Sequence, residues 1–181
     1  VRLEPLSLAL YEGTFNGTTV VDVRGAQPKF DVRAKLAGVQ SGPLLQDYMG
    51  DDKVHGRSDA QLAITTGGET VGALKKALNG TVALSFRDGA IKNFNLAEQL
   101  RVAEARLKKQ EYQSQGTRPT DFSSLTVSGQ FKNGVLHTDD LDMRSPLLRV
   151  SGKGKVNVAA ENLDYRAIVT VTDEKTGQGG D

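Results

Sequence analysis

Residues 147–158 have the sequence LLRVSGKGKVNV, and this stretch decides the fold class. From Leu148 to Val158, every second residue is apolar or glycine, and the residues between them are polar or charged. Successive side chains of a β-strand point to opposite faces, so the pattern predicts a strand with one apolar and one wet face. The same alternation returns at 163–172 and, upstream, at 124–131.

Turn signals connect these alternating runs. Asn133-Gly134 directly follows the run at 124–131, and both residues tolerate the positive φ angles of a tight hairpin turn. A partner strand is predicted at 135–144, and Glu161-Asn162 marks the turn before the last strand. Residues 122–172 therefore predict a four-stranded antiparallel meander.

The N-terminal half shows the same alternation, which predicts strands near 3–12, 14–24, 29–38, 54–66 and 80–88. Buried parallel strands have continuous apolar runs, so alternation favours antiparallel pairing. Several strands have about ten residues, and a strand of that length spans ~33 Å. We therefore expect a mainly β fold (α+β), a long antiparallel, curved sheet that is groove-like or a meander.

Three short amphipathic helices interrupt the strands, at about 42–49, 70–78 and 96–110, and are expected to cover part of one face. Ser41 is the expected N-terminal cap of the first helix, and Gly50 is its expected end. Asn79-Gly80 is expected to end the second helix, and Asn95 with Glu98 forms a variant of the capping box at the start of the third.

Length and composition limit the domain organisation. The 181 residues are enough for one domain with a sizeable core, which we expect at 1–172. Residues 173–181 end in GQGGD and are expected to form a flexible tail. No apolar run approaches the ~20 residues that span a bilayer, so we expect any membrane anchor to lie outside this sequence.

Charge and cysteine content exclude several functions. The net charge of +1 gives no electrostatic footprint for nucleic acid and no polybasic patch for anionic lipid headgroups, so no nucleic-acid partner is expected. The absence of cysteine excludes disulfides and thiolate metal sites.

No motif marks a catalytic or metal centre. Gly67-Gly68 lacks a following Lys-Ser/Thr pair and is interpreted as a sharp turn rather than a phosphate loop. His55 and His137 are too few for zinc, which needs three or four ligands. Asp139-Asp140 with Asp142 has oxygen ligands suited to calcium, but a solvated strand edge is the preferred interpretation. Two carboxylates that converge in space would leave no mark in the sequence. We expect no enzyme, no cofactor and no metal.

The apolar face has two interpretations that stay open at this point. It is either an ordinary core beneath the helices or a trough that holds acyl chains, since a large exposed apolar face usually marks a binding surface. The candidate lining residues of such a groove are Leu125, Val127, Phe131, Leu148, Val150, Val156, Val158, Leu163, Tyr165 and Val169.

Five blocks, in order, resemble the C-terminal region of the AsmA family. They are LAGVQSGPLL (36–45), LKKALNGT (74–81), FRDGAIKNFNL (86–96), TDFSSL (120–125) and SPLLRVSGKG (145–154). The blocks resemble LxGVxxxPLL, LxxxLNGT, xxDGAIxGxNL, TxFxxL and SPLLRVxGxG, and they extend the resemblance over about 36–170. Asn93 stands where the family pattern has glycine.

The resemblance implies the periplasmic part of a Gram-negative protein with one N-terminal inner-membrane anchor and a role in outer-membrane biogenesis. Larger relatives look like bridge-like lipid carriers, so phospholipid is the implied ligand, guided along an apolar β-groove between the two membranes. The family supplies no catalytic residues. The alternatives are an interaction module that docks envelope proteins through its sheet edges and, less favoured, an envelope enzyme.

Overall fold

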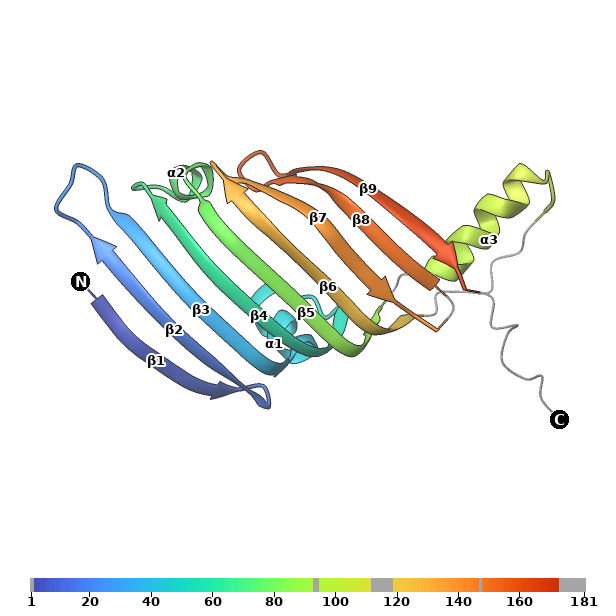
Figure 1. Cartoon of the computed structure of the whole chain (residues 1–181), viewed down its shortest axis with the longest axis horizontal. Helices are drawn as coiled ribbons and strands as arrows, with labels where there is room; N and C mark the ends of the chain where they lie inside the picture. Colours follow the sequence, from blue (N-terminus) through green and yellow to red (C-terminus); the bar gives the residue numbers. More distant parts are fainter. Residues whose placement is uncertain (1, 93–94, 112–118, 147, 173–181) are drawn as a thin grey trace.

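The computed structural model describes residues 2–92, 95–111, 119–146 and 148–172, and it contains one curved, unclosed β-sheet (Figure 1). Nine strands follow one another across the sheet in chain order, and every neighbouring pair is antiparallel. The strands are β1 (Arg2–Leu10), β2 (Gly13–Asp22), β3 (Lys29–Gln40), β4 (Val54–Gly67), β5 (Asn79–Ile91), β6 (Thr120–Lys132), β7 (Val135–Arg144), β8 (Leu148–Asn157) and β9 (Asn162–Val171). The predicted fold class is confirmed.

The predicted C-terminal meander is confirmed as β6 to β9. Its first hairpin turns at Asn133 and Gly134, whose φ angles of 49° and 78° are those that the dipeptide was expected to adopt. Glu161 has a φ of 53° in the turn before β9, and Asn162 is already the first residue of that strand. The predicted tail at 173–181 lies outside the described residues.

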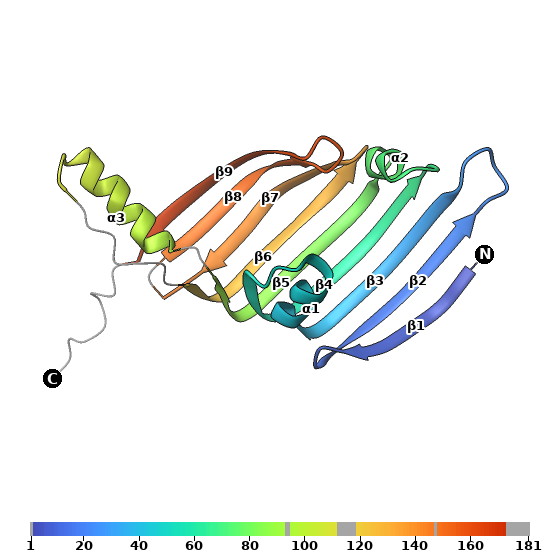
Figure 2. The same cartoon turned by 180° about the vertical axis from the view of Figure 1, so that it is seen from behind.

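Three helices lie in the connections between strands: α1 (Ser41–Met49), α2 (Val71–Lys76) and α3 (Leu96–Leu107). Figure 1 shows α1 behind β4 and β5, and Figure 2 shows it in front of them, so it lies on one face of the sheet. In both views α3 points away from the sheet. The helices that cover part of a face are therefore α1 and α2.

The start of α1 differs from the prediction. Ser41 is the first helical residue rather than the cap, and the cap, Gln40, makes no side-chain hydrogen bond to the helix. The Ser41 hydroxyl is buried and donates instead to the backbone oxygens of Val54 (2.9 Å) and Gly56 (3.0 Å). Packing against β4 therefore overrides the capping role. Gly50 ends the helix in the left-handed conformation, with a φ of 67°, as predicted.

The other two helices are shorter than predicted. Thr70 caps α2 by accepting a hydrogen bond from the Ala73 backbone (3.2 Å), and Asn79 already belongs to β5 rather than ending the helix. At α3 the predicted cap, a variant of the capping box, is confirmed: the Asn95 side chain accepts from the Glu98 backbone (3.0 Å) and donates to the Glu98 carboxylate (3.2 Å).

Candidate binding faces of the sheet

The strand register collects the alternating apolar residues into rows that cross the whole sheet on one face. In the central row, Leu62 pairs with Ala34 on one side and with Val82 on the other. The row continues through Gly17 on β2 and Gly129 on β6. A neighbouring row contains Leu36, Ala60 and Leu84, and the row on the opposite side contains Thr19, Val32, Ile64, Phe131, Leu136, Val156 and Leu163. We call this surface the apolar face.

Helix α1 covers one end of the apolar face. Val39 is fully buried and lies opposite Ser58, which points to the same face as Leu62 four residues along β4. Of the helices, α1 is the one that contacts β3 and β4 at this point, so it supplies the cover over Val39. Figure 2 shows it in that position.

The same end of the face contains the hydrophobic core. Phe122, Met143 and Val150 are 3%, 4% and 8% exposed and form one cluster. Val54, Phe86, Ile91, Leu125 and Val169 pack against it. We call this region the closed end.

Helix α2 lies over the opposite end of the strands. The Thr66 hydroxyl shares its face with Leu62 and Ile64, and it donates a 2.6 Å hydrogen bond to the backbone oxygen of Leu74 in α2. Between the two helices, the large apolar side chains of β3 to β5 remain partly exposed. We call this central region, represented by Val32, Leu62, Ile64, Val82 and Leu84, the open middle.

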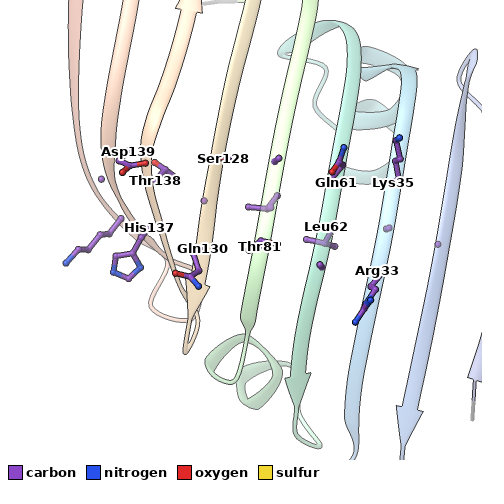
Figure 3. Close-up of a pocket in the computed structure, with 18 of the residues that line it drawn as sticks. Arg33, Lys35, Gln61, Leu62, Thr81, Ser128, Gln130, His137, Thr138 and Asp139 are labelled. Carbon is purple, nitrogen blue, oxygen red and sulfur yellow. The ribbon is translucent and has the colours of Figure 1, made fainter.

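A hollow of about 1120 Å³ lies elsewhere on the sheet, and Figure 3 shows its lining. It takes three successive residues from each of seven strands, β2 to β8. A hollow on the apolar face would also be walled by large side chains of the neighbouring rows, such as Val32, Ile64 and Leu84, and none of these lines it. The hollow therefore belongs to the opposite face, which we call the polar face.

The model of the AsmA family matches residues 1–141. This chain belongs to the AsmA family. The match covers four of the five blocks that carried the resemblance and ends before the block at 145–154. No curated protein and no solved structure matches the chain. Membership of the family is consistent with a role in the cell envelope and in outer-membrane biogenesis. In the described ranges, no helix is long and apolar enough to cross a membrane.

The candidate lining residues of the AsmA chain share the apolar face but differ in accessibility. Leu148 and Val150 are buried at the closed end, and Leu125 and Val169 pack there as well. The half-buried candidates are Val127, Phe131, Val156 and Tyr165, whereas Leu163 on the edge strand is 69% exposed. Val158 follows the end of β8, where its backbone N–H donates to the Gly134 oxygen (3.0 Å). Contact of any of them with lipid stays a prediction.

Two glycines let the Tyr165 ring pack closely against β8 on this face. A β-carbon on Gly152 would come within 2.7 Å of the Tyr165 ring, and one on Gly154 within 2.6 Å of it. The Tyr165 hydroxyl is 2.9 Å from the Thr138 hydroxyl, so the ring spans β8 and is fastened to β7. Packing against the Tyr165 ring, rather than turn geometry, therefore excludes any residue with a β-carbon at these two positions.

The remaining sequence candidates do not converge on a chemical centre. Among the described residues of the AsmA chain, no group of three or more His, Asp or Glu is placed to hold a metal. His55 Nε2 is 3.1 Å from Asp52, and the ammonium of Lys92, bound to the same carboxylate, holds the pKa of Asp52 below its usual value. The His137 ring is 3.2 Å from the backbone oxygen of Val135. Gly68 has a φ of 139° and donates to the Pro28 oxygen, which is turn geometry as interpreted.

The acidic cluster on β7 corrects an expectation. β7 pairs with both β6 and β8, so Asp139, Asp140 and Asp142 do not protect a sheet edge. A register shift between Thr138 and Leu141 places Asp139 and Asp140 in a bulge. The Asp140 carboxylate accepts hydrogen bonds from the hydroxyl and backbone N–H of Ser128, which hold its pKa below the usual value.

Proposed function

We propose that this AsmA chain binds phospholipid acyl chains on its apolar face and so helps to move or shelter phospholipid during outer-membrane biogenesis. The observation that carries the proposal is the open middle, where rows of large apolar side chains remain partly exposed between α1 and α2. The face extends to the edge strands, where Leu6 and Leu163 are 52% and 69% exposed. An apolar surface of this kind normally marks a binding site.

The size of the strands suits a lipid. β4 has 14 residues and β5 has 13, and a strand of about ten residues already spans ~33 Å, close to the ~30 Å of a bilayer hydrocarbon core. Each methylene group that leaves water contributes about 0.8 kcal/mol, so an acyl chain lying along the open middle gains substantial free energy without any polar contact. The proposed role is therefore binding, not catalysis.

Family membership supports the proposed location. We place the chain in the periplasm of a Gram-negative bacterium, as a domain of a protein anchored in the inner membrane, with lipid passing between the inner and outer membranes. The absence of cysteine is compatible with the same compartment.

Adjacent residues on opposite faces give a matched test. A photoreactive phenylalanine analogue at Leu62 or Val82 samples the open middle, and the same analogue at Ala63 or Ala83 samples the polar face of the same two strands. In cells that carry the whole protein, we expect crosslinks to phospholipid from Leu62 and Val82 at least about fivefold above those from Ala63 and Ala83, detected by mass spectrometry. Equal labelling from both faces, or none from either, would reject the proposal.

A second candidate function is docking of an envelope partner by strand addition, and the two sheet edges favour β9 for it. β1 contains Pro5, which has no N–H to donate, and its pairing with β2 is interrupted by a register shift between Leu3 and Leu6. β9 runs ten residues without proline, and its pairing with β8 is continuous. Proline in place of Ile168 should abolish capture of such a partner from envelope extracts if β-augmentation is the route, and unchanged capture would exclude it.

A further inference from the structure

Two pairs of basic residues bound the hollow on the polar face. Arg33 and Lys35 lie two residues apart on β3, and Lys153 and Lys155 have the same spacing on β8. Residues two apart in a strand point to the same face, so each pair presents both charges together. All four side chains are exposed, and Asp139 is the one carboxylate in the lining described. Figure 3 shows Arg33 and Lys35 on the side of the hollow opposite His137 and Asp139.

The two basic pairs are far apart. Four strands, β4 to β7, lie between β3 and β8, so the pairs are separated by about 24 Å at ~4.8 Å per strand. A single phosphate or carboxylate cannot contact both. The hollow volume of about 1120 Å³ likewise exceeds the range of ~300–1000 Å³ typical of small-molecule pockets. An elongated ligand is required.

The charges of these pairs are largely unmatched. In the part of the chain that the structure describes, no carboxylate lies within ion-pair distance of Lys35, Lys153 or Lys155. Asp164 lies opposite Lys155 in the register, but the two side chains do not form an ion pair. Arg33 is 3.6 Å from Asp31, and both side chains are exposed, so this ion pair is weak. An acidic ligand would therefore gain contacts without breaking strong internal ones.

Between the basic pairs the surface is neutral or acidic. Ala63, Thr81, Ala83 and Ser128 form a floor of small side chains. A smaller neighbouring hollow shares Ala83 and Ser128 and adds Asp59 and Asp140. Asp59 is paired with Arg87, whereas Asp139 and Asp140 have no cationic partner within ion-pair distance among the described residues. These two carboxylates would repel a uniformly charged polymer such as polyphosphate or nucleic acid. No Phe, Tyr or Trp is among the described lining residues, so the hollow lacks the row of large aromatic side chains on which single-stranded nucleic acid stacks successive bases.

We propose that this hollow binds an extended protein segment that carries acidic residues at both ends and a short, uncharged middle. At ~3.4 Å per residue, a span of about 24 Å corresponds to about seven positions along the segment, from the centre of one acidic group to the centre of the other. The segment crosses the strands and is held by side chains, because β3 to β8 each pair with strands on both sides and offer no free edge. This site lies on the face opposite the apolar face, so the two proposals are independent. A failure to detect lipid binding would not contradict the peptide site, and a failure to detect peptide binding would not contradict lipid binding.

Two peptides of equal charge test the spacing. The first is a fluorescein-labelled peptide with two glutamates at each end and about five serines and glycines between them, and the second has all four glutamates at one end. Fluorescence anisotropy at low salt should show saturable binding of the first peptide to the whole protein. The second peptide should bind at least about fivefold more weakly, because it reaches one basic pair only. Equal affinities, or no saturable binding up to about millimolar concentration, overturn the proposal.

Matched variants test the residues. The double variants Arg33→Gln/Lys35→Gln and Lys153→Gln/Lys155→Gln should each raise the Kd of the first peptide about tenfold, which corresponds to ~1.4 kcal/mol. The control Lys76→Gln/Lys109→Gln removes the same net charge from exposed positions outside the hollow and should change the Kd by less than about twofold. Circular dichroism verifies that each variant is folded. A similar loss in all three variants would show non-specific attraction and overturn the proposal.

Competition identifies the class of ligand. Sodium polyphosphate and vesicles of phosphatidylcholine with phosphatidylglycerol are added to the complex of the protein with the first peptide. If either competitor displaces the peptide at a concentration of negative charge comparable to that of the peptide, and if both double variants lose binding of that competitor, the hollow would be assigned to a polyanion or a membrane surface instead. We expect displacement only at much higher concentrations, as general screening produces.

Discussion

The closed end and the open middle of the apolar face have the same sequence pattern and different environments. Val150 at the closed end and Leu62 in the open middle both occupy the apolar position of an alternating strand. Val150 packs with Phe122 and Met143 and is 8% exposed, whereas Leu62 lies between Ala34 and Val82 and is half-exposed. Alternation therefore identifies the face of a strand but not whether that part of the face is core or binding surface.

The difference comes from what closes each region. At the closed end, α1 lies against β3 and β4, and Phe122, Val54 and Ile91, from near the ends of three strands, pack in the cluster with Met143 and Val150. In the open middle no such second layer is described, so hydrophobic stabilisation must come from side-chain contacts within the sheet alone. We infer that the closed end contributes most to stability and that the open middle is available for ligand.

The largest expected effect separates these two regions on one strand. Phe122→Ala at the closed end should lower the free energy of unfolding by about 3–5 kcal/mol, the usual cost of deleting a buried phenylalanine ring. Phe131→Ala, nine residues along β6 in the partly exposed part of the face, should cost roughly 1–2 kcal/mol because less of its surface is buried. Urea unfolding followed by circular dichroism measures both. Equal losses would show that the two regions do not differ.

Much of this architecture was predictable from local sequence. Alternation located the strands and their faces, and Asn133-Gly134 located a hairpin, because both signals depend only on residues adjacent in the chain. Short connections then make β1 to β3 and β6 to β9 neighbours in chain order, whereas β3 to β6 are joined through the connections that contain α1, α2 and α3. The helix at 96–110 was marked by Asn95 and Glu98, whose hydrogen bonds form within one turn.

The sites were less predictable because they depend on register between distant strands. Val150 and Val156 look alike in sequence, yet only Val150 shares its row with Met143 and Leu125, the side chains of the core at the closed end. Bulges add to this, since the extra residue at Asp139-Asp140 shifts the register with β8. The hollow joins residues from Asn16 to Lys155, and an overall charge of +1 hid its two basic pairs.

A smaller effect is expected at Tyr165, whose hydroxyl on β9 is hydrogen-bonded to the Thr138 hydroxyl on β7. Tyr165→Phe removes the hydrogen bond to Thr138 and keeps the ring over Gly152 and Gly154, so it should cost about 1 kcal/mol of unfolding free energy. Tyr48→Phe is the matched control, because Tyr48 is 80% exposed and should change stability by less than about 0.5 kcal/mol. Urea unfolding of both variants checks this. Identical stabilities would mean that the Tyr165 hydroxyl is as well bonded to water as to Thr138.

The smallest expected effect concerns the polar face and appears only at acidic pH. Bonds from Ser128 lower the pKa of Asp140 in the folded chain, so this carboxylate stabilises the fold above its unfolded pKa of about 3.9 and loses that contribution as the pH falls further. Asp140 is exposed, so the contribution should be less than about 1 kcal/mol. Asp140→Asn should therefore make stability fall less steeply between pH 5 and pH 2, measured by urea unfolding at each pH. Asp139→Asn changes the same charge in the same bulge, and a slope altered equally by both variants would assign the effect to net charge rather than to the bonds with Ser128.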